Sequence, residues 1–292
     1  MITKPYGRDL TVSCIGLGAG QIGDASLSEA HIERLLNTAL DLGIRLIDTA
    51  RGYGLSEERI GRHLKHRRSD YLLSTKVGYG IPGLPDWTGE TIAAGIEAAL
   101  RLLQTDVIDI VHLHSCDLAV LQHGDVVPAL LRAREQGKIR VAAYSGENEA
   151  LAWAVHSGHF GGVECSVNLF DQGSLSPLLE DAAARGIGVI AKRPIGNAPW
   201  RFADRPVGDY AETYWQRMHE LRYDNAGLAW DELALRFTTG LPSISCAITG
   251  TGSLDHLRHN VELAARGPLP HELQLALRAR YAEVGATWRG EV

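Results

Sequence analysis

Four polar residues follow short apolar segments of this chain, in an order that suggests acid–base chemistry. Asp48 and Lys76 lie near the ends of two such segments, and His114 ends a third. Tyr53 lies in a glycine-flanked loop just after Asp48. A phenol with a pKa near 10 gives up its proton poorly at neutral pH, and a nearby ammonium lowers that pKa by stabilising the phenolate. These residue types, at the same end of successive strands, predict a tyrosine that works as a proton donor.

The elements that must position these side chains alternate between strands and helices from about residue 11 to residue 266. The strand candidates are short and mostly continuous apolar runs, as expected for parallel strands covered on both faces. They are Val12–Gly18, Ile44–Thr49, Tyr71–Val77, Val107–His114, Ile139–Ser145, Gly162–Asn168, Gly186–Lys192 and Ser245–Thr249. Amphipathic stretches lie between them, and a Ser26-x-x-Glu29 capping box precedes the first.

Eight strands, each followed by a helix, favour a (β/α)8 barrel that forms a single domain over residues 1–292. A doubly wound sheet would also alternate, but no break in composition marks a second domain. We expect a lead-in segment before the first strand and an extra helix over residues 269–288. Residues 193–227 are expected to form an irregular loop over the carboxyl ends of the strands.

Composition limits the classes of function. A net charge of -6 argues against a general nucleic-acid surface. No apolar run is long enough to span a bilayer, and the first residues lack the apolar core of a secretion signal. The four cysteines have no metal-ligand spacing. We therefore expect a cytoplasmic protein with reduced thiols, no bound metal and no membrane partner.

One motif suggests a different fold. Gly18-Ala-Gly-Gln-Ile-Gly23 matches the G-x-G-x-x-G pattern of Rossmann dinucleotide sites and follows a strand. That mechanism requires the helix to begin on the glycines, so that its N-terminus meets the pyrophosphate. Here four residues from Asp24 onward separate the motif from the expected helix, and Asp48 is late for a ribose ligand. The Rossmann interpretation is therefore disfavoured.

With these residues in view, the chain resembles the aldo-keto reductase superfamily over nearly its whole length. The ordered motifs that carry the resemblance include Asp48-Thr-Ala-Arg-Gly-Tyr-Gly-Leu-Ser-Glu57, Ser74-Thr-Lys76, Asp109-Ile-Val-His-Leu-His114 and Gly250-Thr-Gly-Ser253. The resemblance implies a metal-free reductase of small carbonyl compounds that uses NADP(H). Tyr53 would protonate the carbonyl oxygen, Lys76 would lower the pKa of Tyr53, Asp48 would hold Lys76, and His114 would orient the substrate.

The resemblance also implies a cofactor site. The turn Gly250, Thr251, Gly252 and Ser253, followed by a helix, would meet a phosphate with free N–H groups. Beyond it, the resemblance places His256 and Arg258 near the 2′-phosphate, Asn260 at the adenine, and Ser145 and Asn168 at the nicotinamide carboxamide. Many relatives have a basic residue at position 250 and an arginine at position 256, so NAD(H) stays possible. Lys192 stands where many relatives stack a tyrosine on the nicotinamide, so Lys192 or Arg193 would cover the ring.

The substrate is less defined by the sequence. Trp87, Trp200 and Trp215 are candidate pocket walls, and aromatic walls suit apolar and sugar-like carbonyls equally. Two other functions stay open. One is a nucleotide-binding, redox-sensing regulatory subunit resembling potassium-channel β-subunits; the other is a lyase or isomerase that uses Lys76 as a Schiff-base amine. The sequence does not define the oligomeric state.

Overall fold

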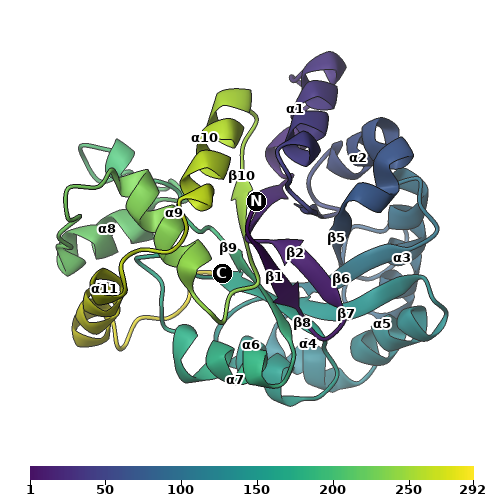
Figure 1. The fold of residues 1–292 in the computed structure, drawn as a ribbon. Helices are drawn as coiled ribbons and strands as arrows, with labels where there is room; N and C mark the ends of the chain where they lie inside the picture. The colour runs from purple at the N-terminus through teal and green to yellow at the C-terminus, as the bar shows by residue number, and fades with distance from the viewer.

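Eight parallel strands close into a barrel with helices around it, as Figure 1 shows. The computed structural model describes residues 1–292, apart from the side chain of His123. The barrel strands are β3 (Ile15–Gly18), β4 (Leu46–Asp48), β5 (Leu72–Val77), β6 (Ile108–His114), β7 (Ile139–Ser145), β8 (Gly162–Ser166), β9 (Gly188–Lys192) and β10 (Cys246–Gly250). The barrel closes where β10 pairs with β3. The expected (β/α)8 barrel is confirmed.

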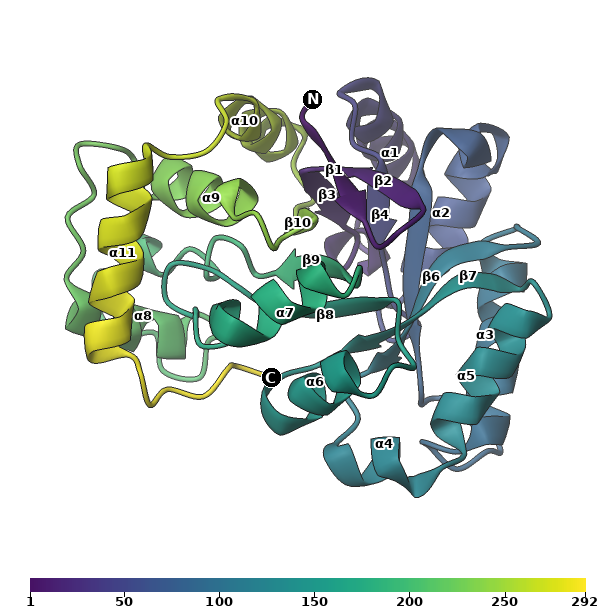
Figure 2. The same ribbon diagram turned by 60° about the horizontal axis from the view of Figure 1, so that its bottom comes forward.

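Helices cover the outside of the barrel (Figure 2). They are α1 (Glu29–Asp41), α2 (Ser56–Leu64), α3 (Gly89–Leu102), α4 (Leu118–His123), α5 (Val126–Glu135), α6 (Asn148–His156), α7 (Glu180–Ala184), α8 (Glu212–Leu221), α9 (Trp230–Gly240), α10 (Leu254–Ala265) and α11 (His271–Val284). Helix α11 is the expected extra helix. Of the helices that the structure describes, none has both the length and the apolar character needed to cross a membrane.

Three local predictions were wrong. The expected strand Val12–Gly18 divides at Cys14, because β2 (Leu10–Ser13) pairs antiparallel with β1 (Thr3–Tyr6) in a separate hairpin. Helix α1 is capped by Ser28, whose side chain accepts from the His31 N–H, and not by Ser26. The segment 193–227 is not irregular throughout, because it contains α8.

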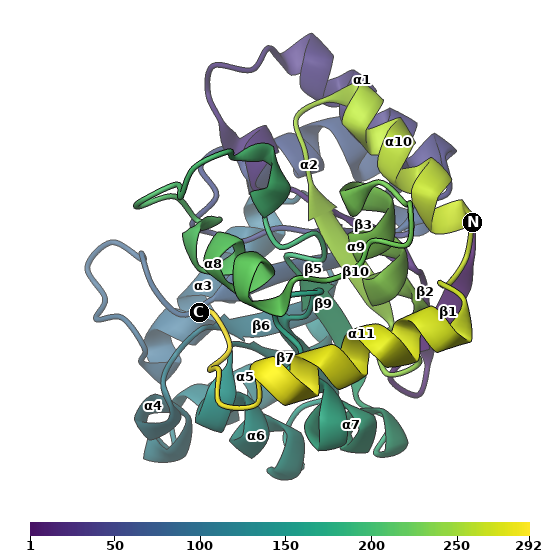
Figure 3. The same ribbon diagram turned by 90° about the vertical axis from the view of Figure 1, so that its left-hand side faces the viewer.

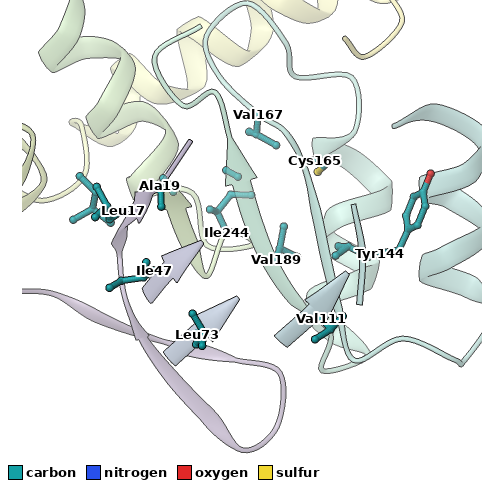
Figure 4. Close-up of a cluster of buried hydrophobic side chains, with 14 of the residues drawn as sticks. Leu17, Ala19, Ile47, Leu73, Val111, Tyr144, Cys165, Val167, Val189 and Ile244 are labelled. Carbon is teal, nitrogen blue, oxygen red and sulfur yellow. The ribbon is translucent and has the colours of Figure 1, made fainter. Parts of the chain in front are cut away.

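Successive side chains of each barrel strand point alternately outward and inward, and so form two separate apolar clusters. Side chains that point outward pack under the helices, and Figure 4 shows Leu17, Ile47, Leu73, Val111 and Val189 from five different strands in this layer. Side chains that point inward form a second, smaller cluster inside the barrel. This two-residue period is what a parallel sheet buried on both faces requires.

The β1–β2 hairpin fills one end of the barrel. Tyr6, Leu10 and Val12 are buried in the interior cluster. A Cβ atom at Gly162 would lie 2.0 Å from the Tyr6 hydroxyl, and one at Gly188 would lie 2.5 Å from the Tyr6 ring. These two strand glycines therefore make room for the Tyr6 side chain.

Strand register brings the polar residues level at the other end. Asp48 pairs with Ser74, Lys76 pairs with His112, and His114 pairs with Ser145. On β4, β6 and β9 the interior position below each polar residue is apolar: Leu46, Ile110 and Ile190. The barrel is thus apolar at the hairpin end and polar at the carboxyl ends of the strands, where barrel enzymes carry their sites.

The last residues return to this polar end. After α11 the chain runs toward α6, so that its C-terminal residue lies near α6 in Figure 2, and Figure 3 shows α11 crossing the outside of the molecule before this turn. The Asn148 side chain at the start of α6 donates to the Gly290 carbonyl (3.1 Å) and accepts from the Gly290 N–H (2.9 Å). We call residues 288–292 the tail segment.

Candidate active site

A buried ion cluster lies at the polar end of the barrel. The Lys76 ammonium donates to Asp48 Oδ2 (2.5 Å) and to the Thr49 carbonyl (3.1 Å). It also lies 3.3 Å from Glu164 Oε2 on β8. The side chains of Asp48, Lys76 and Glu164 are almost fully buried, at 1–2% exposure. Two carboxylates therefore share one ammonium in a site with little water to screen them.

This arrangement explains the ionisation of the cluster. Burial raises the pKa of Asp48 to about 6, helped by the charge of Glu164 and opposed by Lys76. Burial alone would lower the pKa of Lys76, but the charges of Asp48 and Glu164 outweigh it and raise that pKa above its ordinary value. Lys76 is therefore a permanent cation at neutral pH.

A second layer of polar groups supports Asp48. The Ser74 hydroxyl donates to Asp48 Oδ1 (2.7 Å) and lies 3.1 Å from His112 Nε2. His112 is fully buried, and burial lowers its pKa to about 3. Because it lies below the mouth of the barrel, His112 belongs to the support of the ion cluster. His114, two residues later on the same face, is the histidine at the opening.

Tyr53 lies above the ion cluster. The Lys76 ammonium is 5.6 Å from the centre of the Tyr53 ring, and the His114 ring stands nearly perpendicular to it at 6.1 Å. Lys76 has the largest effect on the pKa of Tyr53 and lowers it, as expected from the sequence. Burial and the charges of Asp48 and Glu164 together outweigh this effect and raise the pKa to about 12. The expected net lowering is therefore not found, and the hydroxyl is held in its protonated form.

His114 is uncharged at neutral pH. Burial lowers its pKa to about 3, helped by the positive charges of Lys76 and Lys192. A neutral imidazole has one N–H donor and one acceptor nitrogen. His114 Nδ1 lies 2.8 Å from the hydroxyl of Tyr79. The structure thus brings the side chains of Asp48, Tyr53, Lys76 and His114 together at the carboxyl ends of the strands.

A second ion pair borders this opening on the β9 side. Lys192 Nζ lies 3.3 Å from Oε1 of the buried Glu147. Burial raises the pKa of Glu147 to about 7, although Lys192 and the Ser166 N–H both lower it. Lys192 is close enough to act on the pKa of His114, so this ammonium is part of the electrostatic environment of the site.

Arg193, the next residue, holds the tail segment. Its guanidinium donates to the Glu291 carbonyl (2.8 Å), the Val292 carbonyl (3.0 Å) and the Ser166 hydroxyl (3.2 Å). Its backbone has a positive φ of 53°, and the Asn168 side chain donates to its carbonyl (3.0 Å). Arg193 therefore fixes the tail segment against the ends of β8 and β9.

Asn168 and Ser145, the two residues expected to bind the carboxamide, differ in how far their polar atoms are already hydrogen-bonded. Asn168 is fully buried, and its Oδ1 also accepts from the Phe170 N–H (2.8 Å), so both ends of its amide contact the backbone. Its geometry is that of a residue that shapes the loop after β8. Ser145 donates to Glu164 Oε1 over a longer distance of 3.5 Å, at the level of the ion cluster.

The residues expected to bind the phosphate lie apart from this cluster, at the end of β10 and the start of α10. Ser253 caps the helix by accepting from the His256 N–H, and Thr251 Oγ1 accepts from the Ser253 N–H (3.0 Å). His256 and Arg258 are exposed on the first turns, and Asn260 is half-buried. A helix N-terminus with exposed basic side chains suits a phosphate group. The residues at Gly250–Ser253 therefore fit the phosphate end of a dinucleotide.

The comparisons with known proteins agree with this geometry. The model of the aldo/keto reductase family matches residues 14–277. The chain belongs to this family. It is 27% identical to the L-galactose dehydrogenase of Arabidopsis thaliana over 86% of this chain and 84% of that protein. It is 28% identical to an uncharacterised oxidoreductase of Bacillus subtilis, YqkF, over 93% of each chain.

A solved structure supports the same assignment. A putative aldo-keto reductase from Pseudomonas aeruginosa superposes with a TM-score of 0.74 at 28% identity, over 91% of this chain and 95% of that one. The chain is therefore an oxidoreductase of the aldo/keto reductase family, with the barrel of that family.

The aromatic residues expected at the pocket of this reductase lie in different surroundings. Trp87 packs edge-on against Tyr79 at 5.8 Å, and Tyr79 in turn stacks on His114. Trp200 stacks on Trp230 of α9 at 6.3 Å, and Trp215 donates to the Phe202 carbonyl (3.1 Å). Within the described residues, only Trp87 of the three expected tryptophans is linked to His114 by ring contacts, through Tyr79.

Sequence reasoning missed two residues of the site. Glu164 is not among the site residues predicted from the sequence, and its contact with Lys76 depends on barrel closure. Tyr79 was not considered, although it follows Lys76 closely and has glycines on both sides, as Tyr53 does. That local similarity is the signal that could have identified it.

Proposed function

We propose that this protein is an NAD(P)H-dependent oxidoreductase that reduces an aldehyde or ketone, or oxidises the corresponding alcohol or sugar, with Tyr53 as the proton donor. The observation that carries the proposal is the Lys76 ammonium, held beside the Tyr53 ring by two buried carboxylates. A fixed cation at this position stabilises the phenolate that forms when Tyr53 releases its proton.

Each residue of the cluster has a defined role in this proposal. Tyr53 Oη gives its proton to the carbonyl oxygen, and in the opposite direction the phenolate accepts the alcohol proton. Asp48 and Glu164 keep Lys76 charged and in place. His114, being neutral, donates a hydrogen bond to the substrate oxygen through its single N–H. A nicotinamide cofactor supplies or accepts the hydride when it is bound.

The cofactor is assigned to the ends of the strands from β7 to β10. The turn Gly250, Thr251, Gly252 and Ser253 would bind the pyrophosphate through those of its N–H groups that are not used within the turn, since the Ser253 N–H donates to Thr251 Oγ1. His256 and Arg258 would contact a 2′-phosphate, which favours NADP(H) over NAD(H), and Asn260 would contact the adenine. Ser145 would reach the carboxamide. Lys192 or Arg193 would cover the nicotinamide, with Asn168 supporting Arg193.

The substrate is assigned to the opening beside Tyr53 and Trp87. Trp200 and Trp215 are the remaining candidates for pocket walls. One relative is named for the oxidation of L-galactose, so aldoses belong with simple aldehydes and ketones among the compounds to be tested.

The test measures NADPH oxidation with a panel of carbonyl compounds, and NADP⁺ reduction with the matching alcohols and aldoses. Tyr53→Phe should lower kcat by about 100-fold or more, the scale of general acid catalysis, while the Kd for NADPH stays unchanged. Tyr71→Phe is the matched control, because the Tyr71 hydroxyl is buried just before β5 and has no hydrogen-bond partner among the residues that the structure describes.

Full activity of Tyr53→Phe would refute the proposed mechanism. Tight NADPH binding without turnover of any compound would instead favour a nucleotide-binding regulatory subunit. Substrate trapped on Lys76 by borohydride would favour Schiff-base chemistry.

A further inference from the structure

Tyr79 makes the closest polar contact to His114. Its hydroxyl lies 2.8 Å from His114 Nδ1, and the two rings stack at 5.4 Å with an angle of 26°. Nothing in the proposed function assigns a role to this residue. The contact matters because the chemistry proposed for His114 depends on which ring nitrogen carries the proton.

The surrounding loop holds the Tyr79 side chain in place. The Trp87 ring packs edge-on against the Tyr79 ring, and the backbone N–H of Trp87 donates to the Gly78 carbonyl (2.7 Å). A Cβ atom at Gly78 would lie 2.0 Å from the Trp87 ring, and one at Gly52 would lie 2.9 Å from the Tyr79 hydroxyl. Two glycines thus leave space for the two aromatic side chains. The position of the Tyr79 hydroxyl is therefore built into the loop between β5 and α3.

The direction of the hydrogen bond follows from the chemistry of the two groups. Burial raises the pKa of Tyr79, although Lys76 opposes this, so its phenol keeps its proton at neutral pH and has an O–H to donate. The unprotonated nitrogen of a neutral imidazole is a strong acceptor. If Nδ1 carried the proton instead, Nε2 would be an acceptor and would repel a carbonyl oxygen that gains negative charge.

We propose that Tyr79 is a positioning residue, whose hydroxyl donates to His114 Nδ1 and thereby confines the ring proton to Nε2. This inference rests on the proposed function, in which His114 donates to the substrate oxygen. The Nε2–H and the Tyr53 O–H then form a pair of donors at one opening, and the developing alkoxide meets both. Tyr79 contributes indirectly, through the tautomer of its neighbour.

The test reads the tautomer directly. Long-range 1H–15N NMR spectra of the protein labelled with 15N-histidine distinguish a protonated Nε2 from a protonated Nδ1, and the signals of His114 are assigned from the spectrum of His114→Asn. We expect only the Nε2–H form of His114 in the wild type. Tyr79→Phe keeps the ring and its stacking but removes the donor, so both tautomers should appear, and kcat should fall about tenfold with little change in KM.

The matched control is Tyr144→Phe. It removes a buried hydroxyl that donates to the Cys116 carbonyl (2.7 Å) from the outward face of β7, and both kcat and the His114 tautomer should stay unchanged. A single Nε2–H form in Tyr79→Phe, or an Nδ1–H form in the wild type, would overturn the proposal. A wild-type protein that turns over no carbonyl would overturn the proposed function instead, and the spectra would still decide what sets the tautomer.

Discussion

Replacing Lys76 with methionine should lower the stability of the protein in a pH-dependent way. Methionine has a similar size but no charge, so Asp48 and Glu164 would remain buried together without their cation. Both carboxylates lie within 3.3 Å of the ammonium, and all three side chains are almost fully buried. Removing one partner of a buried ion pair costs about 3–5 kcal/mol. We expect a loss of that size in the free energy of unfolding at about pH 7.5.

The pH dependence follows from the pKa of Asp48. Burial and Glu164 already raise it to about 6 in the presence of Lys76, against about 3.9 in an unfolded chain. A carboxyl group with a raised folded pKa stabilises the protein at low pH, and this stability is lost as pH rises from the unfolded to the folded pKa. In the wild type the loss ends near pH 6. In Lys76→Met the folded pKa is higher still, so the loss continues above pH 6.

The difference in the free energy of unfolding between the wild type and Lys76→Met should therefore grow by about 1.4 kcal/mol per pH unit above pH 6. Between about pH 6 and pH 7.5 this amounts to about 2 kcal/mol, which leaves a difference of about 1–3 kcal/mol at pH 6. The assay is urea unfolding at both pH values, followed by tryptophan fluorescence.

Lys4→Met is the matched control. The Lys4 ammonium donates to the carbonyls of Thr239 (2.7 Å), Leu241 (2.8 Å) and Ile244 (2.9 Å), which do not titrate. Its stability loss should be the same at both pH values. The reasoning is refuted if the loss in Lys76→Met is equally independent of pH, or if it stays below about 1 kcal/mol at pH 7.5.

Two further substitutions probe the ends of the barrel. Gly162→Ala places a Cβ atom 2.0 Å from the Tyr6 hydroxyl and should lower the free energy of unfolding by about 1–3 kcal/mol in thermal melts. In the control Gly161→Ala the atom closest to the new Cβ would be 3.2 Å away, so the free energy of unfolding should stay unchanged. Arg258→Ala should weaken NADPH binding by about tenfold or more without changing NADH binding, as measured by fluorescence titration. Arg101→Ala on α3 should change neither Kd, and an equal loss for both nucleotides with Arg258→Ala would contradict its assignment to the 2′-phosphate.

Much of the fold could be predicted because local pattern and global structure agree in the barrel strands. Strands such as β9 are buried on both faces, so a run such as Gly188–Ala191 appears in the sequence as a continuous apolar segment. Helix α8 was missed because its stability comes from distant contacts. Its Tyr214 and Arg217 are buried against the loop after β8, where both contact Asp171. Of the three buried side chains of α8, that of Arg217 is charged and that of Tyr214 carries a hydroxyl, so the buried face does not appear in the sequence as an apolar stripe.

The candidate site could be predicted where its residues follow strand ends, and not where they depend on barrel closure. Asp48, Lys76 and His114 lie on consecutive strands, so their proximity follows from strand order. Glu164 reaches Lys76 from β8 across the barrel interior, which no local motif indicates. The sequence also predicted a net lowering of the pKa of Tyr53 by Lys76, whereas burial, Asp48 and Glu164 together outweigh Lys76 and raise that pKa.

The hairpin beneath the barrel has a consequence for how the buried charges exchange with solvent. Tyr6, Leu10 and Val12 close one end of the barrel. Within the described chain, water and protons therefore reach Lys76 from the other end, where Tyr53 and His114 lie. A molecule resting on those two rings would isolate the ions beneath from the bulk. Asp48, Lys76 and Glu164 could then exchange no protons with solvent while the molecule is bound, so they would keep the charge state that they had before binding.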